Sequence, residues 1–181
     1  MNTQSIRIAL SLMLGLALAA PAGCSADVPT GPTMPVTPAA TGTPTGNPAE
    51  DEARSRILAV YNGYLEAFIK ASATSDYRTI ELAAYVGEPL LGQLLNGLYI
   101  FSLNGIHSEG RPTWSPTVAE LSLSTGEAVI QDCFDGTNWN SVGGKTPPPP
   151  QAKRYPVVVK AKQVNGRWYV YESVAERGSP C

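Results

Sequence analysis

Histidine and cysteine are scarce in this sequence, which contains one histidine, His107, and three cysteines. A tetrahedral zinc site needs Cys or His ligands that converge from several positions, so this small supply argues against a metal site. Charge is also sparse: 15% of the residues are charged and the net charge is −2. Such a balance lacks the basic surface that nucleic-acid binding requires. The apolar run at residues 8–20 is too short to be a convincing transmembrane helix.

The N-terminus has the layout of an export signal, residues 1–23, in which Arg7 precedes the apolar run and small residues follow it. The letters PAGC resemble the lipobox of bacterial lipoproteins, in which the cysteine after the cut receives a diacylglyceryl group. This resemblance implies that Cys24 is lipidated and anchors the protein to the outer face of the cell membrane. Pro21 departs from the pattern, because the family prefers leucine or another apolar residue there. The alternative is ordinary cleavage after Ala20-Pro21-Ala22, which would give a secreted protein.

The remainder of the chain divides into two parts by composition. Residues 24–47 are rich in Pro, Thr, Ala and Gly and cannot bury enough apolar surface to fold, so we expect a disordered, lipid-anchored tether. Residues 48–181 have the length and hydrophobic content of one small globular domain.

Cysteine pairing follows from the anchor. An exported chain favours disulfides, and lipidation of Cys24 leaves Cys133 to pair with Cys181. Cys133 lies in QDCFDGTNW, residues 131–139, which could also be interpreted as a nucleophile site. In that case Cys133 would act with His107, and its thiol would have to stay free outside the cell. We favour the disulfide, which would tie the C-terminal tail to a sheet.

Three helices are predicted in the first half of the domain. The letters NPAE at residues 47–50 combine an N-cap, a proline at the first helical position and a capping glutamate, and apolar residues then recur at helical spacing. A short second helix is expected between residues 75 and 85, capped by a serine or an aspartate. Pro89 opens a third helix with a leucine stripe, and Asn104 with Gly105 ends it.

The second half is predicted to be antiparallel sheet. Thr125-Gly126 separates TVAELSLS from EAVIQDCF, and Asn165-Gly166 separates YPVVVKAKQV from RWYVYESVA, so two hairpins are expected. A two-residue turn places Val164 opposite Arg167 and fixes the register.

Alternation along the second hairpin then predicts which side chains the helices cover. The covered face is expected to carry Val157, Val159, Ala161, Gln163, Trp168, Val170, Glu172 and Val174. The other face is expected to carry Lys160, Lys162, Tyr169 and Tyr171. In the first hairpin, Asp132 shares a face with Ala128, Ile130 and Phe134, while Cys133 points the opposite way.

The elements together predict an α+β fold in which three N-terminal helices pack on a curved antiparallel sheet of about four strands. The segments ILAVYNGYLEAF, VAELSLSTGEAVIQDCFDGTNW and VNGRWYVYESVAERGSPC resemble small exported actinobacterial lipoproteins whose domain has the cone-like, nuclear-transport-factor-2-like fold. That family is mostly without assigned function. The resemblance implies a cavity between the helices and the concave face of the sheet.

Six residues are candidates to line such a cavity: Tyr61, Tyr64, Tyr85, Asp132, Trp168 and Glu172. A carboxylate buried among apolar residues could act as a general acid or base. No residues match the catalytic constellation of the isomerases that share the fold, so we assign no catalytic residue and no cofactor.

The predicted function is a non-catalytic binding or accessory module of the cell envelope, held at the membrane through Cys24. Its partner would be an envelope protein or a small-molecule ligand, and an envelope protein would dock on the face that carries Lys160 and Tyr169. The alternative is a small-molecule-binding or isomerase-like enzyme that uses Asp132 or Glu172.

Overall fold

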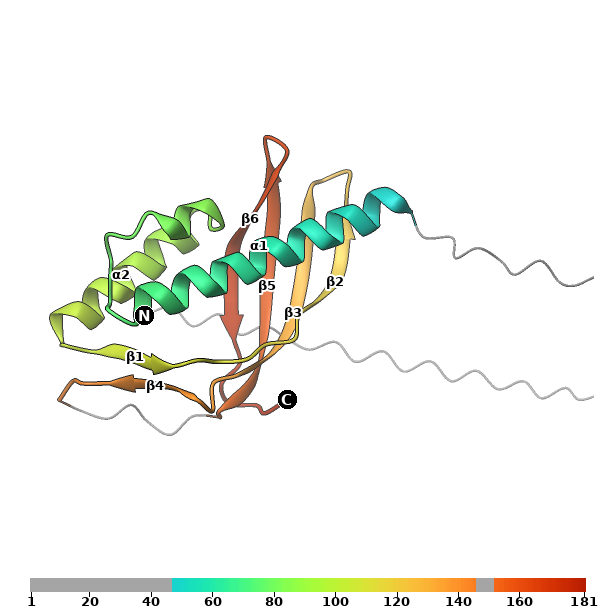
Figure 1. The fold of residues 1–181 in the computed structure, drawn as a ribbon. Helices are drawn as coiled ribbons and strands as arrows, with labels where there is room; N and C mark the ends of the chain where they lie inside the picture. The colour runs from blue at the N-terminus through green and yellow to red at the C-terminus, as the bar shows by residue number, and fades with distance from the viewer. Residues whose placement is uncertain (1–46, 146–151) are drawn as a thin grey trace, which may run out of the picture. The chain divides into compact units, whose positions relative to one another are not determined.

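The computed structural model describes residues 47–145 and 152–181. The predicted signal peptide, the predicted lipidation site Cys24 and all of the predicted tether except Asn47 lie outside the described residues. The elements in chain order are α1 (Pro48–Ser72), the 3-10 helix η1 (Glu81–Ala84), α2 (Leu90–Leu103), β1 (His107–Gly110), β2 (Thr117–Ser122), β3 (Glu127–Asp135), β4 (Trp139–Val142), β5 (Arg154–Val164) and β6 (Arg167–Ala175) (Figure 1).

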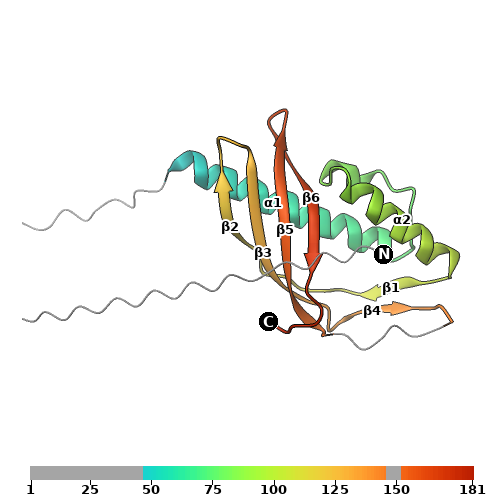
Figure 2. The same ribbon diagram turned by 180° about the vertical axis from the view of Figure 1, so that it is seen from behind.

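The described residues form two antiparallel sheets, one with the strand order β2-β3-β5-β6 and one that pairs β1 with β4. The long helix α1 crosses one face of the four-stranded sheet, and Figure 2 shows the opposite face of that sheet toward the viewer. We call the face opposite α1 the outer face. The α+β class and the four-stranded antiparallel sheet are confirmed, whereas the prediction of three helices is wrong and the two-stranded sheet was not predicted.

Helix α1 begins as the sequence indicates. The side chain of Asn47 accepts a hydrogen bond from the backbone N–H of Ala49 at 3.1 Å, and Pro48 occupies the first turn. The apolar face of the helix packs on the sheet and buries Ile57, Tyr61 and other large side chains. The capping pattern therefore predicts this helix start correctly.

The predicted second helix is reduced to one 3-10 turn. Ser75 has a φ of 51°, in the left-handed region, and the carboxylate of Asp76 accepts a hydrogen bond from the backbone N–H of Arg78 at 3.0 Å. These residues make tight turns instead of capping a helix, because short polar side chains compete for the backbone groups. Regular helix hydrogen bonding resumes only in η1.

The third predicted helix is present as α2, and it ends at Asn104 with Gly105 at a φ of 63°. The Tyr85 ring, just before α2, packs directly against α1 at Gly63. A Cβ atom at position 63 would overlap this ring. The absence of a side chain at Gly63 therefore allows the segment before α2 to approach α1 closely.

Both hairpins form. Val164 pairs with Arg167 across Asn165 and Gly166, which have φ values of 50° and 79°, so the predicted register of the second turn is confirmed. In the first hairpin Ser122 pairs with Glu127, and the turn spans residues 123–126 instead of two residues.

A β-bulge in β6 changes which side chains are covered. Ala161 pairs with Val170, but the preceding residue of β5, Lys160, pairs with Glu172 instead of Tyr171, so Tyr171 is the extra residue. From this point on, every residue of β6 is displaced by one position relative to simple alternation. Glu172 consequently lies opposite Lys160 on the outer face, and the covered position that it was predicted to fill belongs to Ser173.

The predicted covered face is correct for five residues, all of them buried: Val157, Val159, Ala161, Trp168 and Val170. It is wrong for Glu172 and Val174, which the bulge turns outward, and Gln163 is exposed near the end of its strand. Lys160 and Lys162 are exposed, as predicted.

Candidate functional site

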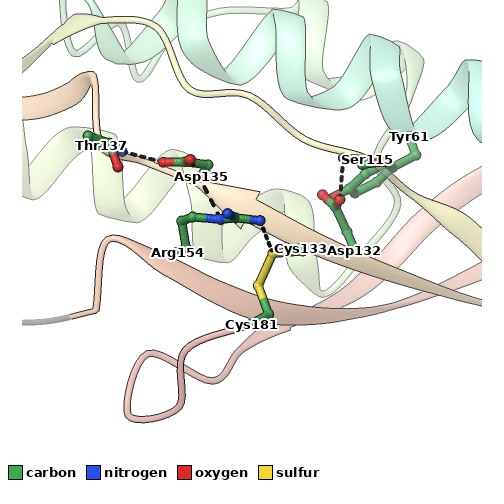
Figure 3. The surroundings of a disulfide bond; sticks show 8 residues. All are labelled: Tyr61, Ser115, Asp132, Cys133, Asp135, Thr137, Arg154 and Cys181. Carbon is green, nitrogen blue, oxygen red and sulfur yellow. Dashed lines mark hydrogen bonds and ion pairs between the residues drawn. A yellow bond between two sulfur atoms is a disulfide. The ribbon is translucent and has the colours of Figure 1, made fainter.

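Asp132 is the buried carboxylate of the domain, with only 6% of its surface exposed. It lies in the middle of β3 on the covered face. Its Oδ2 accepts a hydrogen bond from the hydroxyl of Tyr61 in α1 at 2.8 Å, and its Oδ1 accepts one from the backbone N–H of Ser115 at 2.7 Å (Figure 3). One carboxylate thus joins α1, β3 and the segment that leads into β2, and both of its oxygens have donors.

The two core tyrosines of α1 are held in the protonated state. Burial, followed by the negative charge of Asp132, raises the pKa of Tyr61 well above its ordinary value. Burial raises the pKa of Tyr64 to about 12, although a hydrogen bond with Ser173 acts in the opposite direction. A general acid or base works best when its pKa lies near the operating pH, so neither hydroxyl is suited to proton transfer at neutral pH. The Tyr61 hydroxyl donates a hydrogen bond to Asp132, and both rings pack in the core.

Cys133 points away from Asp132 on the other side of β3, and its sulfur is bonded to that of Cys181. The disulfide prediction is confirmed. The interpretation of Cys133 as a nucleophile with His107 is wrong, because the thiol is consumed in this bond. His107 instead lies in β1, with its ring nitrogen 3.2 Å from a carboxylate oxygen of Glu109.

Arg154 lies between the disulfide and Asp135 (Figure 3). Its guanidinium donates to the sulfur of Cys133 at 3.4 Å, and its Nε lies 3.6 Å from a carboxylate oxygen of Asp135. Hydrogen bonds from Thr137 and the charge of Arg154 hold the pKa of Asp135 below its ordinary value. The two acidic residues near Cys133 therefore have different structural roles. Asp132 accepts hydrogen bonds in the core, and Asp135 accepts a hydrogen bond from Thr137 in the turn after β3.

Two hollows lie along the four-stranded sheet. The first has a volume of about 430 Å³ beside the disulfide, and it is lined by Ser115, Thr117, Gln131, Asp132, Cys133, Pro156, Val157, Val158 and Glu176. The second has a volume of about 290 Å³ and includes Glu120, Glu127, Lys160 and Tyr171. Both are open to solvent, and their lining mixes apolar and polar side chains. They suit contact with a partner surface better than enclosure of a small molecule, which usually has most of its surface buried.

The structure does not bring the six predicted pocket residues together. Tyr61, Tyr64 and Trp168 are buried in the core, and Tyr85 packs against α1. Asp132 is bonded to Tyr61, as described above.

Glu172 is separated from the other five candidate residues because it lies on the outer face. Its carboxylate accepts a hydrogen bond there from the Lys160 ammonium at 3.0 Å. This hydrogen bond, with the charge of Glu172, raises the pKa of Lys160. Sequence reasoning missed this pair, because nothing in the strand marks the bulge. It also missed the backbone donor at Ser115, for which no side-chain signal exists.

Two further classes of site can be checked within residues 47–145 and 152–181. No group of three or more His, Cys, Asp or Glu side chains there is arranged to hold a metal ion. No helix in the same ranges has the length and apolarity needed to cross a membrane.

No protein-family model matches this chain, and no curated protein sequence matches it. Among solved structures, it is similar to the intermembrane-space region of the chloroplast protein ARC6, with 11% identity, a TM-score of 0.48, and 67% of this chain and 95% of that chain covered. It is also similar to an NTF2-like protein of unknown function from Shewanella baltica, with 15% identity, a TM-score of 0.38 and coverage of 70% and 94%. A third similar structure is a protein of unknown function with a cystatin-like fold from Nostoc punctiforme. It has 13% identity and a TM-score of 0.39, and 70% of this chain and 90% of that chain are covered.

Folds described as NTF2-like and cystatin-like are thus among those similar to this chain, but these TM-scores are low and carry no argument about function. Membership of an actinobacterial lipoprotein family stays a prediction.

Proposed function

We propose that this protein is an extracytoplasmic lipoprotein, anchored to the membrane through Cys24, that acts as a non-catalytic binding or accessory module of the cell envelope. The observation that carries the proposal is the placement of the two candidate carboxylates. Both oxygens of Asp132 accept hydrogen bonds in the core, and Glu172 lies on the outer face in an ion pair. Neither is a free base in an interior cavity, so binding through the surface is the better-supported function.

The disulfide supports the extracytoplasmic location. Bonds of this kind persist in oxidising compartments and are rare in the cytosol. The pairing of Cys133 with Cys181 also leaves Cys24 as the remaining cysteine of the chain, which agrees with its use as the lipid attachment site.

The outer face of the sheet is the proposed docking surface. Lys160 and Lys162 lie beside Tyr169 and Tyr171 there, and the guanidinium of Arg167 lies 5.5 Å from the centre of the Tyr169 ring. Tyrosine and arginine are enriched at protein interfaces because they combine a large contact area with hydrogen-bonding groups. The hollow that includes Lys160 and Tyr171 provides a depression on the same face. We therefore propose an envelope protein as the partner.

The anchor is tested by mass spectrometry of the N-terminal peptide from cells that express the wild-type chain or the Cys24→Ser variant. The wild-type peptide is expected to begin at Cys24 and to carry the mass of attached acyl chains, and the variant is expected to leave the membrane fraction. An unmodified wild-type N-terminus after residue 22 would replace the lipoprotein proposal with simple secretion.

The docking surface is tested by crosslinking in intact envelopes. The double variant Lys162→Glu with Tyr169→Ala is expected to lose the crosslinked partner. The control Lys153→Glu, which changes an exposed lysine immediately before β5, is expected to keep it. Identical crosslinks in both variants would exclude this face as the docking surface.

A further inference from the structure

Helix α2 carries no charged residue in its fourteen positions, and its last turn leaves large apolar side chains uncovered. Tyr99 is 42% exposed, Ile100 47% and Leu103 67%. Their spacing places them on one side of the helix. The same side carries polar Asn96 one turn earlier and polar Gln93 two turns earlier, so the apolar surface is confined to the C-terminal end of α2.

The loop after α1 extends this surface. The ring of Tyr77 contacts that of Tyr99 edge to face, with 5.1 Å between the ring centres, and Ile80, three residues further along, is 85% exposed. The guanidinium of Arg78 lies 5.1 Å from the centre of the Tyr77 ring. We call Tyr77, Ile80, Tyr99, Ile100 and Leu103 the apolar end.

We propose that the apolar end lies in the interface of a lipid bilayer and holds the domain against the membrane. Aliphatic side chains next to tyrosines are the composition of protein surfaces at the level of lipid headgroups, where tyrosine keeps its ring in the apolar layer and its hydroxyl in water. Arg78 at the edge supplies a cation for anionic headgroups. At about 21 Å, α2 is too short to cross the apolar layer, so it would lie along the surface.

The length of the N-terminal segment permits this contact. The inference rests on the proposed lipid at Cys24, from which residues 25–46 lead to α1. A chain of that length spans at most about 75 Å, whereas α1 is about 37 Å long. Either end of α1 can therefore reach the bilayer that holds the lipid. Because the anchor keeps the domain at a high local concentration near this bilayer, even a weak apolar contact would be occupied.

The contact is tested with a fluorescent label next to the apolar end. With Cys24 lipidated and the other two cysteines in a disulfide, a cysteine introduced by Asn96→Cys is the free thiol for nitrobenzoxadiazole labelling. The lipidated full-length mature protein is placed in vesicles of phosphatidylcholine and phosphatidylglycerol that contain a nitroxide-bearing lipid. The label at position 96 is expected to be quenched.

Two comparisons define the result. A label introduced by Val174→Cys on the outer face, at a site with 48% exposure, is expected to stay unquenched. Adding Ile100→Ser and Leu103→Ser to the Asn96→Cys protein is expected to remove most of the quenching. Equal quenching at positions 96 and 174 in vesicle-bound protein would overturn the inference and leave the lipid anchor intact. Blue-shifted emission of the label without quenching by the nitroxide lipid would also overturn the inference, because a second copy of this chain would then cover the apolar end.

If mass spectrometry shows that Cys24 carries no lipid, the proposed function fails and the contact is tested on the secreted chain by sedimentation with the same vesicles. Replacing Ile100 and Leu103 by serine is then expected to weaken binding roughly tenfold, from the loss of two partly buried aliphatic side chains. Equal sedimentation of the wild type and this variant would overturn the inference separately from the anchor.

Discussion

Replacing Tyr61 by phenylalanine would remove one oxygen atom from the core and would leave Oδ2 of Asp132 without its side-chain donor. The lost hydrogen bond is 2.8 Å long and joins a hydroxyl to a buried carboxylate. A hydrogen bond to a charged group contributes about 1.5–3 kcal/mol, and an acceptor that stays buried without a partner adds to the cost. We expect the free energy of unfolding to fall by about 2 kcal/mol, which corresponds to about 8 °C in Tm for a domain of this size.

Tyr99→Phe is the matched control, because it removes the same oxygen atom from a half-exposed ring. A surface change of this kind is expected to alter the free energy of unfolding by less than about 0.5 kcal/mol. Asp132→Asn keeps the side-chain shape and an oxygen for the backbone N–H of Ser115, so its cost should be about 1 kcal/mol. Combining Tyr61→Phe with Asp132→Asn should show a coupling energy of about 1 kcal/mol in a double-mutant cycle.

Urea unfolding followed by tryptophan fluorescence measures all four variants against the wild type. Equal stability of Tyr61→Phe and Tyr99→Phe would refute the structural role of the Tyr61 to Asp132 hydrogen bond. Asp132 would then keep the hydrogen bond from the backbone N–H of Ser115 as its structural task, and the enzyme alternative would regain its main candidate.

Three further outcomes are expected. Replacing Cys133 and Cys181 together by serine should lower the free energy of unfolding by about 4 kcal/mol, because the disulfide closes a loop with a sequence separation of 48; equal urea midpoints would contradict this. Because burial raises the pKa of Tyr64 from 10.0 to about 12, its stabilising contribution is complete below about pH 10 and is lost as the pH rises toward about 12; urea titrations across this range should show a shallower decline for Tyr64→Phe. Gly63→Ala should destabilise the domain by about 1–2 kcal/mol, because a Cβ atom at position 63 would overlap the Tyr85 ring. Gly97→Ala in α2, where a Cβ atom would meet no other atom within 4 Å, should stabilise the domain by up to about 1 kcal/mol, and thermal melts of the two variants measure both effects.

Local signals predicted the parts of the fold that local chemistry decides. The N-cap at Asn47 and the Asn165-Gly166 turn each depend on backbone preferences of a few neighbouring residues, and both are present in the structure. The inward position of Asp132 followed from strand alternation, because β3 continues without interruption from Glu127 to Asp135.

The features that sequence reasoning missed depend on contacts between distant segments. The bulge at Tyr171 is fixed by how β6 packs on β5, and strand alternation alone cannot locate it. Ser75 and Asp76 favour both a helix cap and a tight turn, and the turn is chosen by tertiary contacts such as the hydrogen bond from the Ser75 hydroxyl to the carbonyl of Ile106. The partner of Asp132 at Ser115 is a backbone group, which every residue possesses.

The extra residue in β6 divides that strand into two runs whose inward positions alternate in opposite phase along the sequence. Deleting Tyr171 would restore uninterrupted alternation, and it would leave Glu172 opposite Lys160 on the outer face and Ser173 opposite Val159 on the covered face, because these pairs already form beyond the bulge. In related chains, loss of one amino acid at this point would therefore keep the chemistry of the two sides of the strand, and only the sequence spacing of the inward residues would change by one. A comparison of homologues should accordingly align β6 in two separate blocks, one on each side of Tyr171.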